Sequence, residues 1–188
     1  MRETLAGTGA LIRLGLRRDR WLLPAWIAGF AATTYSTAVA GAELYPDVGS
    51  RVEAATALNA TASLVALFGR VYDPTSLGAL SLIKYTAFMA AILAVLMVFI
   101  TVRHTRSDEE SGRLELLGGG RLGRDAPLAA ALAISFGASI VLGLVTAVSL
   151  AAGGLPAAGS IAFGLGWAAT GMAFSAVAGV TAQLTASA

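Results

Sequence analysis

The chain alternates between long uncharged hydrophobic segments and shorter segments that carry the charges. No charged residue occurs from Trp21 to Ala42 or from Tyr85 to Val102, and none follows Asp125. A helix that crosses a membrane needs about 20 predominantly apolar residues. The first two uncharged segments therefore predict one span each, at 21–42 and 85–102.

The third uncharged segment, 126–188, is too long for a single helix and must fold back. The sequence Gly153-Gly154-Leu155-Pro156 is a strong turn signal within it. We expect a third span at 127–151, an external turn at 152–159, a fourth span at 160–180 and a cytoplasmic end at 181–188.

Small residues recur at four-residue intervals on the fourth span, at Gly171, Ser175 and Gly179. Such a face lets two helices approach closely in lipid. The spacing predicts a helix-packing surface.

Composition agrees with this pattern. Of the 188 residues, 56% are hydrophobic and only 13% are charged, and the mean hydropathy is +0.75, outside the usual range of soluble proteins. The expected fold is an all-α integral membrane protein with four transmembrane helices. There is no cysteine, which excludes disulfides and thiolate metal sites.

The remaining segments have helical patterns of their own. Residues 1–20 hold five arginines beside Leu5, Ile12 and Leu16, which predicts an amphipathic interfacial helix. Residues 43–84 are polar again and are expected outside the membrane. There Ser50 to Glu53 resembles a capping box, which predicts a helix over about 51–68.

The most densely charged segment is 103–125. Ser107 to Glu110 has the form of a second capping box, and Gly118 to Gly120 would end the helix that it starts. This predicts a helix at 108–117 of about 15 Å, with Leu114 and Leu117 three apart on one face. A solvated loop helix on the lipid headgroups is the simpler interpretation.

Charge sets the predicted topology. Segments 1–20 and 103–125 contain ten of the 13 Lys and Arg residues. The positive-inside rule therefore places both segments, and the N-terminus, in the cytoplasm.

Several functional classes are unfavoured. The predicted spans contain no ionisable residue, whereas ion-coupled carriers usually need one. No Walker A motif occurs, and the Gly118-x-Gly120-x-x-Gly123 match follows a helix instead of a strand, against nucleotide binding. His104 is the single histidine, so no metal cluster can form around it, and we expect it to contact headgroups. Nothing in the pattern activates a Ser or Thr for hydrolysis.

The amino-acid sequence of the charged segment resembles that of the first cytoplasmic loop of ABC-2-type permeases, in the actinobacterial subfamily described as exporters of polyketide antibiotics. The matching residues are Arg103, His104, Thr105, Arg106, Glu109, Glu110, Gly112, Arg113, Leu114, Glu115, Leu116, Gly123 and Arg124. Further matches occur at 16–20, 72–78, 126–130, 154–159 and 183–185, so the resemblance covers nearly the whole chain. The three glycines after Leu117 depart from the family pattern, which implies a looser hinge.

The resemblance implies that the loop docks onto a separate ABC ATPase subunit, which would bind ATP and Mg. This chain would bind no cofactor itself and no nucleic acid. The loop helix would then be a coupling helix, with its partner interface at Asp108, Glu109, Glu110, Arg113, Leu114 and Leu117. Family chains continue through two six-span halves, so we expect a fragment, or assembly with the remaining permease half or a second copy in the lipid bilayer.

Two functions remain open on the sequence. The chain is either the permease subunit of an ATP-driven exporter of hydrophobic or amphipathic compounds in the plasma membrane, or a four-span scaffold that recruits a cytoplasmic partner through 103–125. Substrate-binding residues are not predicted.

Overall fold

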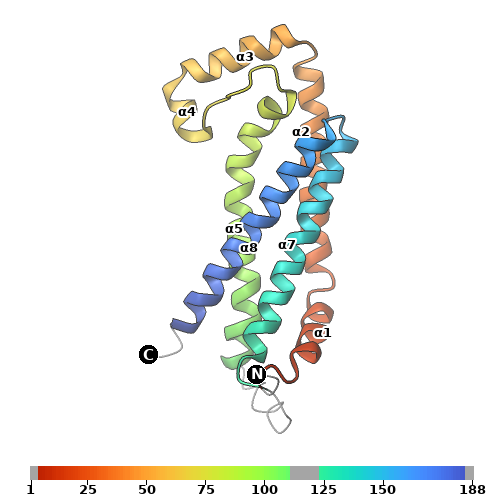
Figure 1. Cartoon of the computed structure of the whole chain (residues 1–188), viewed down its shortest axis with the longest axis vertical. Coiled ribbons are helices and arrows are strands. Elements are labelled where there is room, and N and C mark those ends of the chain that lie inside the picture. Colours follow the sequence, from red (N-terminus) through yellow and green to blue (C-terminus); the bar gives the residue numbers. More distant parts are fainter. Residues whose placement is uncertain (1–3, 111–122, 185–188) are drawn as a thin grey trace. The chain divides into compact units, whose positions relative to one another are not determined.

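The computed structural model describes residues 4–110 and 123–184, and for residues 106–110 the backbone alone. These residues form seven helices and no strand (Figure 1), so the predicted all-helical class is confirmed for them. The helices are α1 (Thr8–Arg18), α2 (Leu22–Leu44), α3 (Val48–Ala60), α4 (Ala62–Phe68), α5 (Leu77–Glu110), α7 (Ala126–Ala152) and α8 (Ala157–Leu184).

Three of the described helices are long and apolar enough to cross a membrane: α5, α7 and α8. Helix α2 has 23 residues, sufficient in length, but it carries the hydroxyl-rich run Thr33–Thr37 and is not among them. The structure thus supports three of the four predicted spans. The crossing by 21–42 stays a prediction.

Helix α5 extends well beyond the predicted span at both ends. It begins at Leu77, where the Ser76 hydroxyl accepts a hydrogen bond from the amide of Ala79 at 3.2 Å. It then continues to Glu110 without a break. The helix start predicted at Ser107 is therefore wrong, because residues 103–110 include no Gly or Pro and can all remain helical.

Where one helix was predicted at 51–68, the structure has two, α3 and α4, and α3 already begins at Val48. Asp47 is the N-cap of α3, since its Oδ1 accepts from the amide of Ser50 at 2.9 Å. The capping box predicted at Ser50 is therefore wrong, because a better cap precedes it. An extended residue, Thr61 (φ −95°, ψ 102°), then separates α3 from α4.

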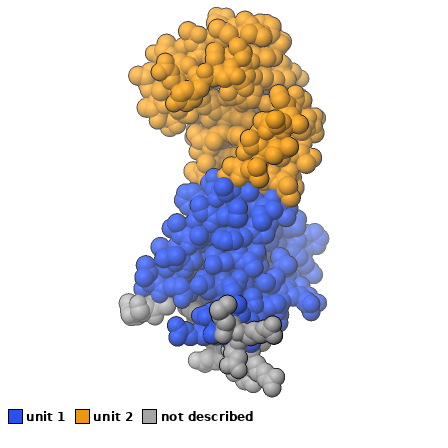
Figure 2. All heavy atoms as spheres, viewed as in Figure 1, with its two compact units in different colours: residues 1–26, 93–141, 168–188 blue, residues 27–92, 142–167 orange. Residues whose placement is uncertain are grey.

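The described chain divides into two compact units (Figure 2). Unit 1 contains Met1–Trp26, Leu93–Val141 and Ala168–Ala188, and unit 2 contains Ile27–Ile92 and Leu142–Trp167. Each is described by itself below.

Unit 2 has an aromatic core around Trp167. The ring centroid of Trp167 lies 5.6 Å from that of Phe30 and 5.9 Å from those of Tyr85 and Phe163. The Tyr85 hydroxyl shares a 2.6 Å hydrogen bond with Thr34 Oγ1, so both buried polar atoms are paired. This pairing lets a polar residue of α2 pack inside an apolar core.

The reversal predicted at Gly153 to Pro156 is present and belongs to unit 2. Gly154 has φ 91°, which favours glycine, and the amide of Leu155 donates to the carbonyl of Leu150 at 3.1 Å. This is a Schellman ending, completed by burial of Leu150 and Leu155.

A second core of unit 2 lies under α3 and α4. It consists of Ala55, Leu58, Val71 and Leu80. The Asn59 side chain fastens the returning chain to it: its amide nitrogen donates to the carbonyl of Val71, and its oxygen accepts from the amide of Val71, both at 2.9 Å. One side chain therefore satisfies both backbone groups of a buried residue.

We expect Asn59→Ala to destabilise unit 2 by about 1–3 kcal/mol, because it leaves the buried amide and carbonyl of Val71 unpaired. Thermal unfolding in detergent measures the change. Thr56→Ala is the matched control on α3, since the Thr56 hydroxyl bonds only to Val52 of its own helix. Equal shifts for the two variants would show that Asn59 does not fasten this segment.

Candidate functional site at the ends of the charged loop

A buried polar cluster in unit 1 joins the end of α1 to the end of α5, directly before the predicted loop helix. Its centre is Asp19, the C-cap of α1, whose amide donates to the carbonyl of Gly15 at 2.9 Å. The Asp19 side chain is fully buried. A carboxylate in such a position must be paired with cations or hydrogen-bond donors.

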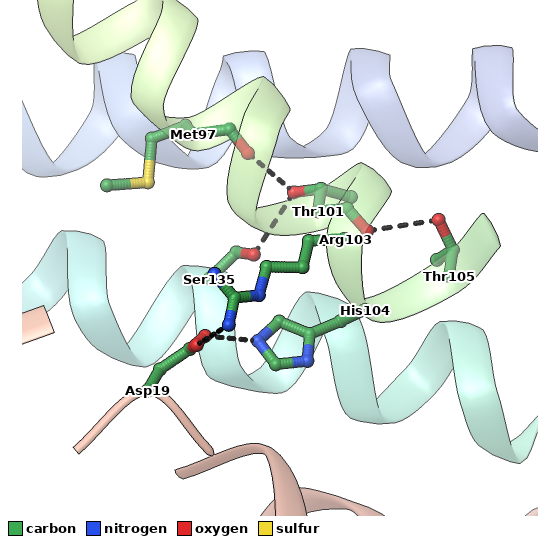
Figure 3. Close-up of polar contacts among 7 residues, drawn as sticks. All are labelled: Asp19, Met97, Thr101, Arg103, His104, Thr105 and Ser135. Carbon is green, nitrogen blue, oxygen red and sulfur yellow. Dashed lines mark hydrogen bonds and ion pairs between the residues drawn. The ribbon is translucent and has the colours of Figure 1, made fainter. Parts of the chain in front are cut away.

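Both partners of Asp19 come from consecutive residues of α5 (Figure 3). Asp19 Oδ2 lies 2.6 Å from Nε2 of His104, and Oδ1 lies 3.3 Å from Nη2 of Arg103. An ionised carboxylate only accepts hydrogen bonds, so Nε2 of His104 is the donor. The His104 side chain is almost as buried as Asp19, whereas that of Arg103 is 28% exposed.

The cluster is not fully satisfied by hydrogen bonds. The contact between Asp19 Oδ1 and Arg103 is an ion pair without hydrogen-bond geometry, and Arg103 Nε is buried with no hydrogen-bond partner among the residues that the structure describes. Unsatisfied buried groups are rare and costly. The cluster therefore holds α1 mainly through charge and through the His104 hydrogen bond.

Gly15 permits this contact. A Cβ atom at Gly15 would lie 3.1 Å from Cε1 of His104 and would also collide with the side chain of Ile134. Glycine thus lets α1 lie close to α5 and α7 without displacing the side chains of His104 and Ile134.

Hydroxyl groups continue the polar contacts from the cluster along α5 and α7 (Figure 3). Thr101 Oγ1 donates to the carbonyl of Met97 at 2.8 Å and lies 3.1 Å from Ser135 Oγ. Ser139 Oγ donates to the carbonyl of Ser135 at 2.8 Å. Hydrogen bonds between hydroxyls are a common way to join helices in lipid.

A second contact ties the N-terminal segment to the start of α7. The amide of Gly123 donates to the carbonyl of Ala6, and the amide of Asp125 donates to that of Thr4, both at 3.0 Å. Residues 4–19 therefore contact both flanks of the charged loop, at the end of α5 through Asp19 and before α7 through the backbone.

The structure corrects the prediction for His104. A headgroup contact was expected, but its side chain is buried against Asp19. The signal in the sequence was Asp19 itself, an acidic residue between Arg18 and Arg20, which needs a partner once its helix packs. Its partner could not be predicted, because Asp19 and His104 lie 85 residues apart in the sequence.

The predicted partner interface lies largely beyond the cluster. Asp108, Glu109 and Glu110 are the last three residues of α5. Arg113, Leu114 and Leu117 lie outside the described residues. The role of all six in a partner interface stays a prediction.

The predicted packing residues of α8 face α7 within unit 1. A Cβ atom at Gly171 would lie 2.5 Å from Ser139 Oγ, and one at Gly179 would lie 3.2 Å from Leu132 Cδ2. Ser175 is buried, and its hydroxyl donates to the carbonyl of Gly171 at 2.8 Å. Of the two glycines, Gly171 is the position of closer approach.

No group of three or more His, Asp or Glu side chains that could hold a metal ion occurs within residues 4–105 and 123–184, where side chains are described. The ion pair with Arg103 and the hydrogen bond with His104 make the cluster around Asp19 a link between α1 and α5. Such a link can fix the position of the loop that follows α5.

These features describe a multi-pass membrane protein whose charged loop is held at both ends. No family model matches the chain. Over 183 residues, or 97% of its length, the chain is 46% identical to the multidrug efflux system permease protein Rv1217c of Mycobacterium tuberculosis. The aligned part is 33% of that protein, so the chain spans about a third of the length of this curated relative.

Proposed function

We propose that this chain forms part of the transmembrane permease of an ATP-driven ABC exporter that moves hydrophobic or amphipathic compounds out of the cell. The observation that carries the proposal is the similarity along 183 residues to a multidrug efflux permease. An apolar chain with no ionisable residue in the predicted spans suits such a compound, and ATP with Mg would be bound and hydrolysed by a separate subunit. The narrower assignment to antibiotic exporters rests on the sequence resemblance alone.

The anchored loop supports a coupling role. A loop that transmits motion from an ATPase must be firmly joined to the helices that it moves. The flanks of 106–122 meet this requirement through Asp19, Arg103 and His104 on one side and through the backbone of Thr4 and Ala6 on the other. In the proposal, the ATPase contacts the interface predicted from Asp108 to Leu117.

The proposed topology has four spans, with α2 as the first, and places the N-terminus and the charged loop in the cytoplasm of a plasma-membrane protein. Direct contacts of residues 4–19 with both loop flanks support one common side for the two basic segments. The positive-inside rule then favours the cytoplasm. The remaining permease half or a second copy would complete the transport pathway.

The test is purification of the full-length native protein in mild detergent. We expect an ATP-hydrolysing subunit to copurify and to be lost from the double variant Leu114→Asp, Leu117→Asp. Two leucines buried against a partner contribute about 1.5–3 kcal/mol each, so their loss weakens binding by at least a hundredfold.

The control is the double variant Leu14→Asp, Leu16→Asp, which changes two exposed leucines of α1 in the other cytoplasmic segment. It should keep the ATPase. If the wild-type protein brings down no ATPase, the export proposal fails and a scaffold that recruits another cytoplasmic protein takes its place.

A further inference from the structure

Unit 2 contains a cavity of about 720 Å³, which has no role in the export function as proposed above. Its apolar walls come from the start of α5, the turn between α7 and α8, and the start of α8, and include Leu77, Leu82, Leu150, Leu155 and Phe163. This volume falls within the range of roughly 300–1,000 Å³ typical of small-molecule sites. The cavity can hold an organic molecule with an apolar body.

The acidic group of the cavity lies in the turn before α5, while α5 and α8 add the hydroxyls of Thr86 and Ser160 to the lining. Asp73 is exposed, and its Oδ1 accepts from the amide of Thr75 at 2.9 Å and from the Thr75 hydroxyl at 2.7 Å. Hydrogen bonds from the Thr75 hydroxyl and then from its amide lower the pKa of Asp73. Asp73 therefore presents a negative charge at the cavity over the whole physiological pH range.

Arg51, the other charged residue of the lining, is already committed to the backbone. Its Nε donates to the carbonyl of Tyr45 at 3.0 Å, and Nη1 and Nη2 donate to those of Thr75 and Pro46 at 3.4 Å. The Nη1 bond joins α3 to the turn that carries Asp73, and the other two bonds hold the Arg51 side chain against the segment before α3. An anionic ligand would have to compete with these carbonyls, whereas a cation meets an accessible carboxylate.

We propose that this cavity binds an amphipathic organic cation, with its apolar body between Leu77, Leu155 and Phe163 and its charged group at Asp73. The inference deepens the proposed function, because it names a class of substrate and its site. The binding itself does not require the ATPase, so the two proposals can fail separately.

The experiment compares two ions of nearly the same shape and opposite charge, tetraphenylphosphonium and tetraphenylborate. Equilibrium dialysis against the full-length protein in lipid nanodiscs measures binding of each, and empty nanodiscs correct for partition into lipid. We expect saturable binding of the phosphonium ion and no saturable binding of the borate ion. Binding of the borate ion with equal affinity would overturn the proposal.

Two variants locate the site. Asp73→Asn keeps an oxygen for the Thr75 bonds and removes the charge, so phosphonium affinity should fall about fivefold, as expected for one exposed charge pair. Gly159→Leu should abolish binding, because Gly159 lines the cavity and no described atom lies within 4 Å of a Cβ built there. The leucine side chain would occupy the space without a clash at its Cβ.

Gly137→Leu is the matched control, since Gly137 of α7 is exposed, has similar open space and does not line the cavity. It should bind as the wild type does. Equal phosphonium binding by all variants would show that the cation binds outside this cavity. Unchanged phosphonium affinity of Asp73→Asn would show that the Asp73 charge does not contribute to binding. Absence of saturable phosphonium binding to the wild type would also overturn the proposal. If the cation binds as described but no ATPase copurifies, the proposed cation site is supported and the proposed export function is contradicted.

Discussion

Removing both side chains that face Asp19 is expected to destabilise the protein more than removing Asp19 itself. The double variant Arg103→Met, His104→Leu leaves a fully buried carboxylate without a partner, at a cost of about 3–5 kcal/mol. Asp19→Asn instead leaves Arg103, which is 28% exposed and reaches solvent, and an amide oxygen that still accepts from His104. Its cost should be about 2 kcal/mol.

The triple variant, with Asp19→Leu added to the double variant, gives the sharpest form of this prediction. Replacing a whole buried ionic cluster by apolar residues of similar volume is often neutral or stabilising. We expect the triple variant to recover to within about 1 kcal/mol of the wild-type stability. This recovery would show that the double variant is weakened by an unpaired charge and not by lost packing.

Thermal unfolding in detergent measures this series, with a shift in Tm of roughly 2–4 °C for each kcal/mol. Arg13→Met is the control: Arg13 is an exposed cation of α1 outside the cluster, so its Tm should barely change. If Asp19→Asn proved as damaging as the double variant, desolvation of the carboxylate would not be the dominant cost. If the triple variant stayed as unstable as the double variant, lost packing and not an unpaired charge would explain the loss of stability.

The elements that could be predicted from the sequence are those set by local patterns. Helices α7 and α8 follow from one uncharged segment with a single strong turn signal, and the structure has a Schellman ending at that place. The limits of α5 could not be predicted in this way. Hydropathy marks where a helix leaves the apolar region, whereas Arg, Ser, Asp and Glu continue a helix readily when no Gly or Pro follows.

Helix α2 shows the converse limit. Its polar run lowers hydropathy but does not break the helix, because the hydroxyls bond to carbonyls one turn earlier: Thr33 to Gly29 at 2.9 Å and Thr37 to Thr33 at 2.7 Å. Thr34 pairs instead with Tyr85 of α5. A partner 51 residues away cannot be seen in a local pattern.

The candidate site was missed for the same reason. The loop was predicted from its own charges, but the residues that anchor its flanks are Asp19, 85 residues before His104, and the backbone near the N-terminus. The sequence shows Asp19, Arg103 and His104 separately. Their pairing depends on the close packing that Gly15 allows, which is a property of three helices together.

Substitution of Gly164 is expected to disrupt the packing of α8 on α7 within unit 2. Gly164 is buried, and a Cβ atom there would collide with the backbone carbonyl of Gly143 and lie 2.9 Å from the Cβ of Ala147. A flexible side chain could move away, but a helix carbonyl cannot, so the two helices would have to separate. We expect Gly164→Ala to cost about 3 kcal/mol and Gly164→Leu to abolish the folded, monodisperse protein.

Gly166 is the matched control two residues further along α8. It is exposed, and no described atom lies within 4 Å of a Cβ built there. Because alanine favours a helix over glycine by up to about 1 kcal/mol, Gly166→Ala should be neutral or stabilising. The same substitution should therefore destabilise the protein at Gly164 but not at Gly166, two residues further along the same helix.

Gly171 provides the intermediate case and connects this prediction to the sequence pattern. A Cβ there would lie 2.5 Å from Ser139 Oγ and 2.9 Å from Ser139 Cβ, but its three nearest atoms are all side-chain atoms, so Gly171→Ala should cost about 2 kcal/mol, less than Gly164→Ala. The face predicted from Gly171, Ser175 and Gly179 extends two turns back to Gly164, because seven residues return to the same side of a helix. Thermal unfolding should rank Gly164 as most sensitive, then Gly171, then Gly166. Equal effects at Gly164 and Gly166 would mean that close backbone contact does not hold these helices together.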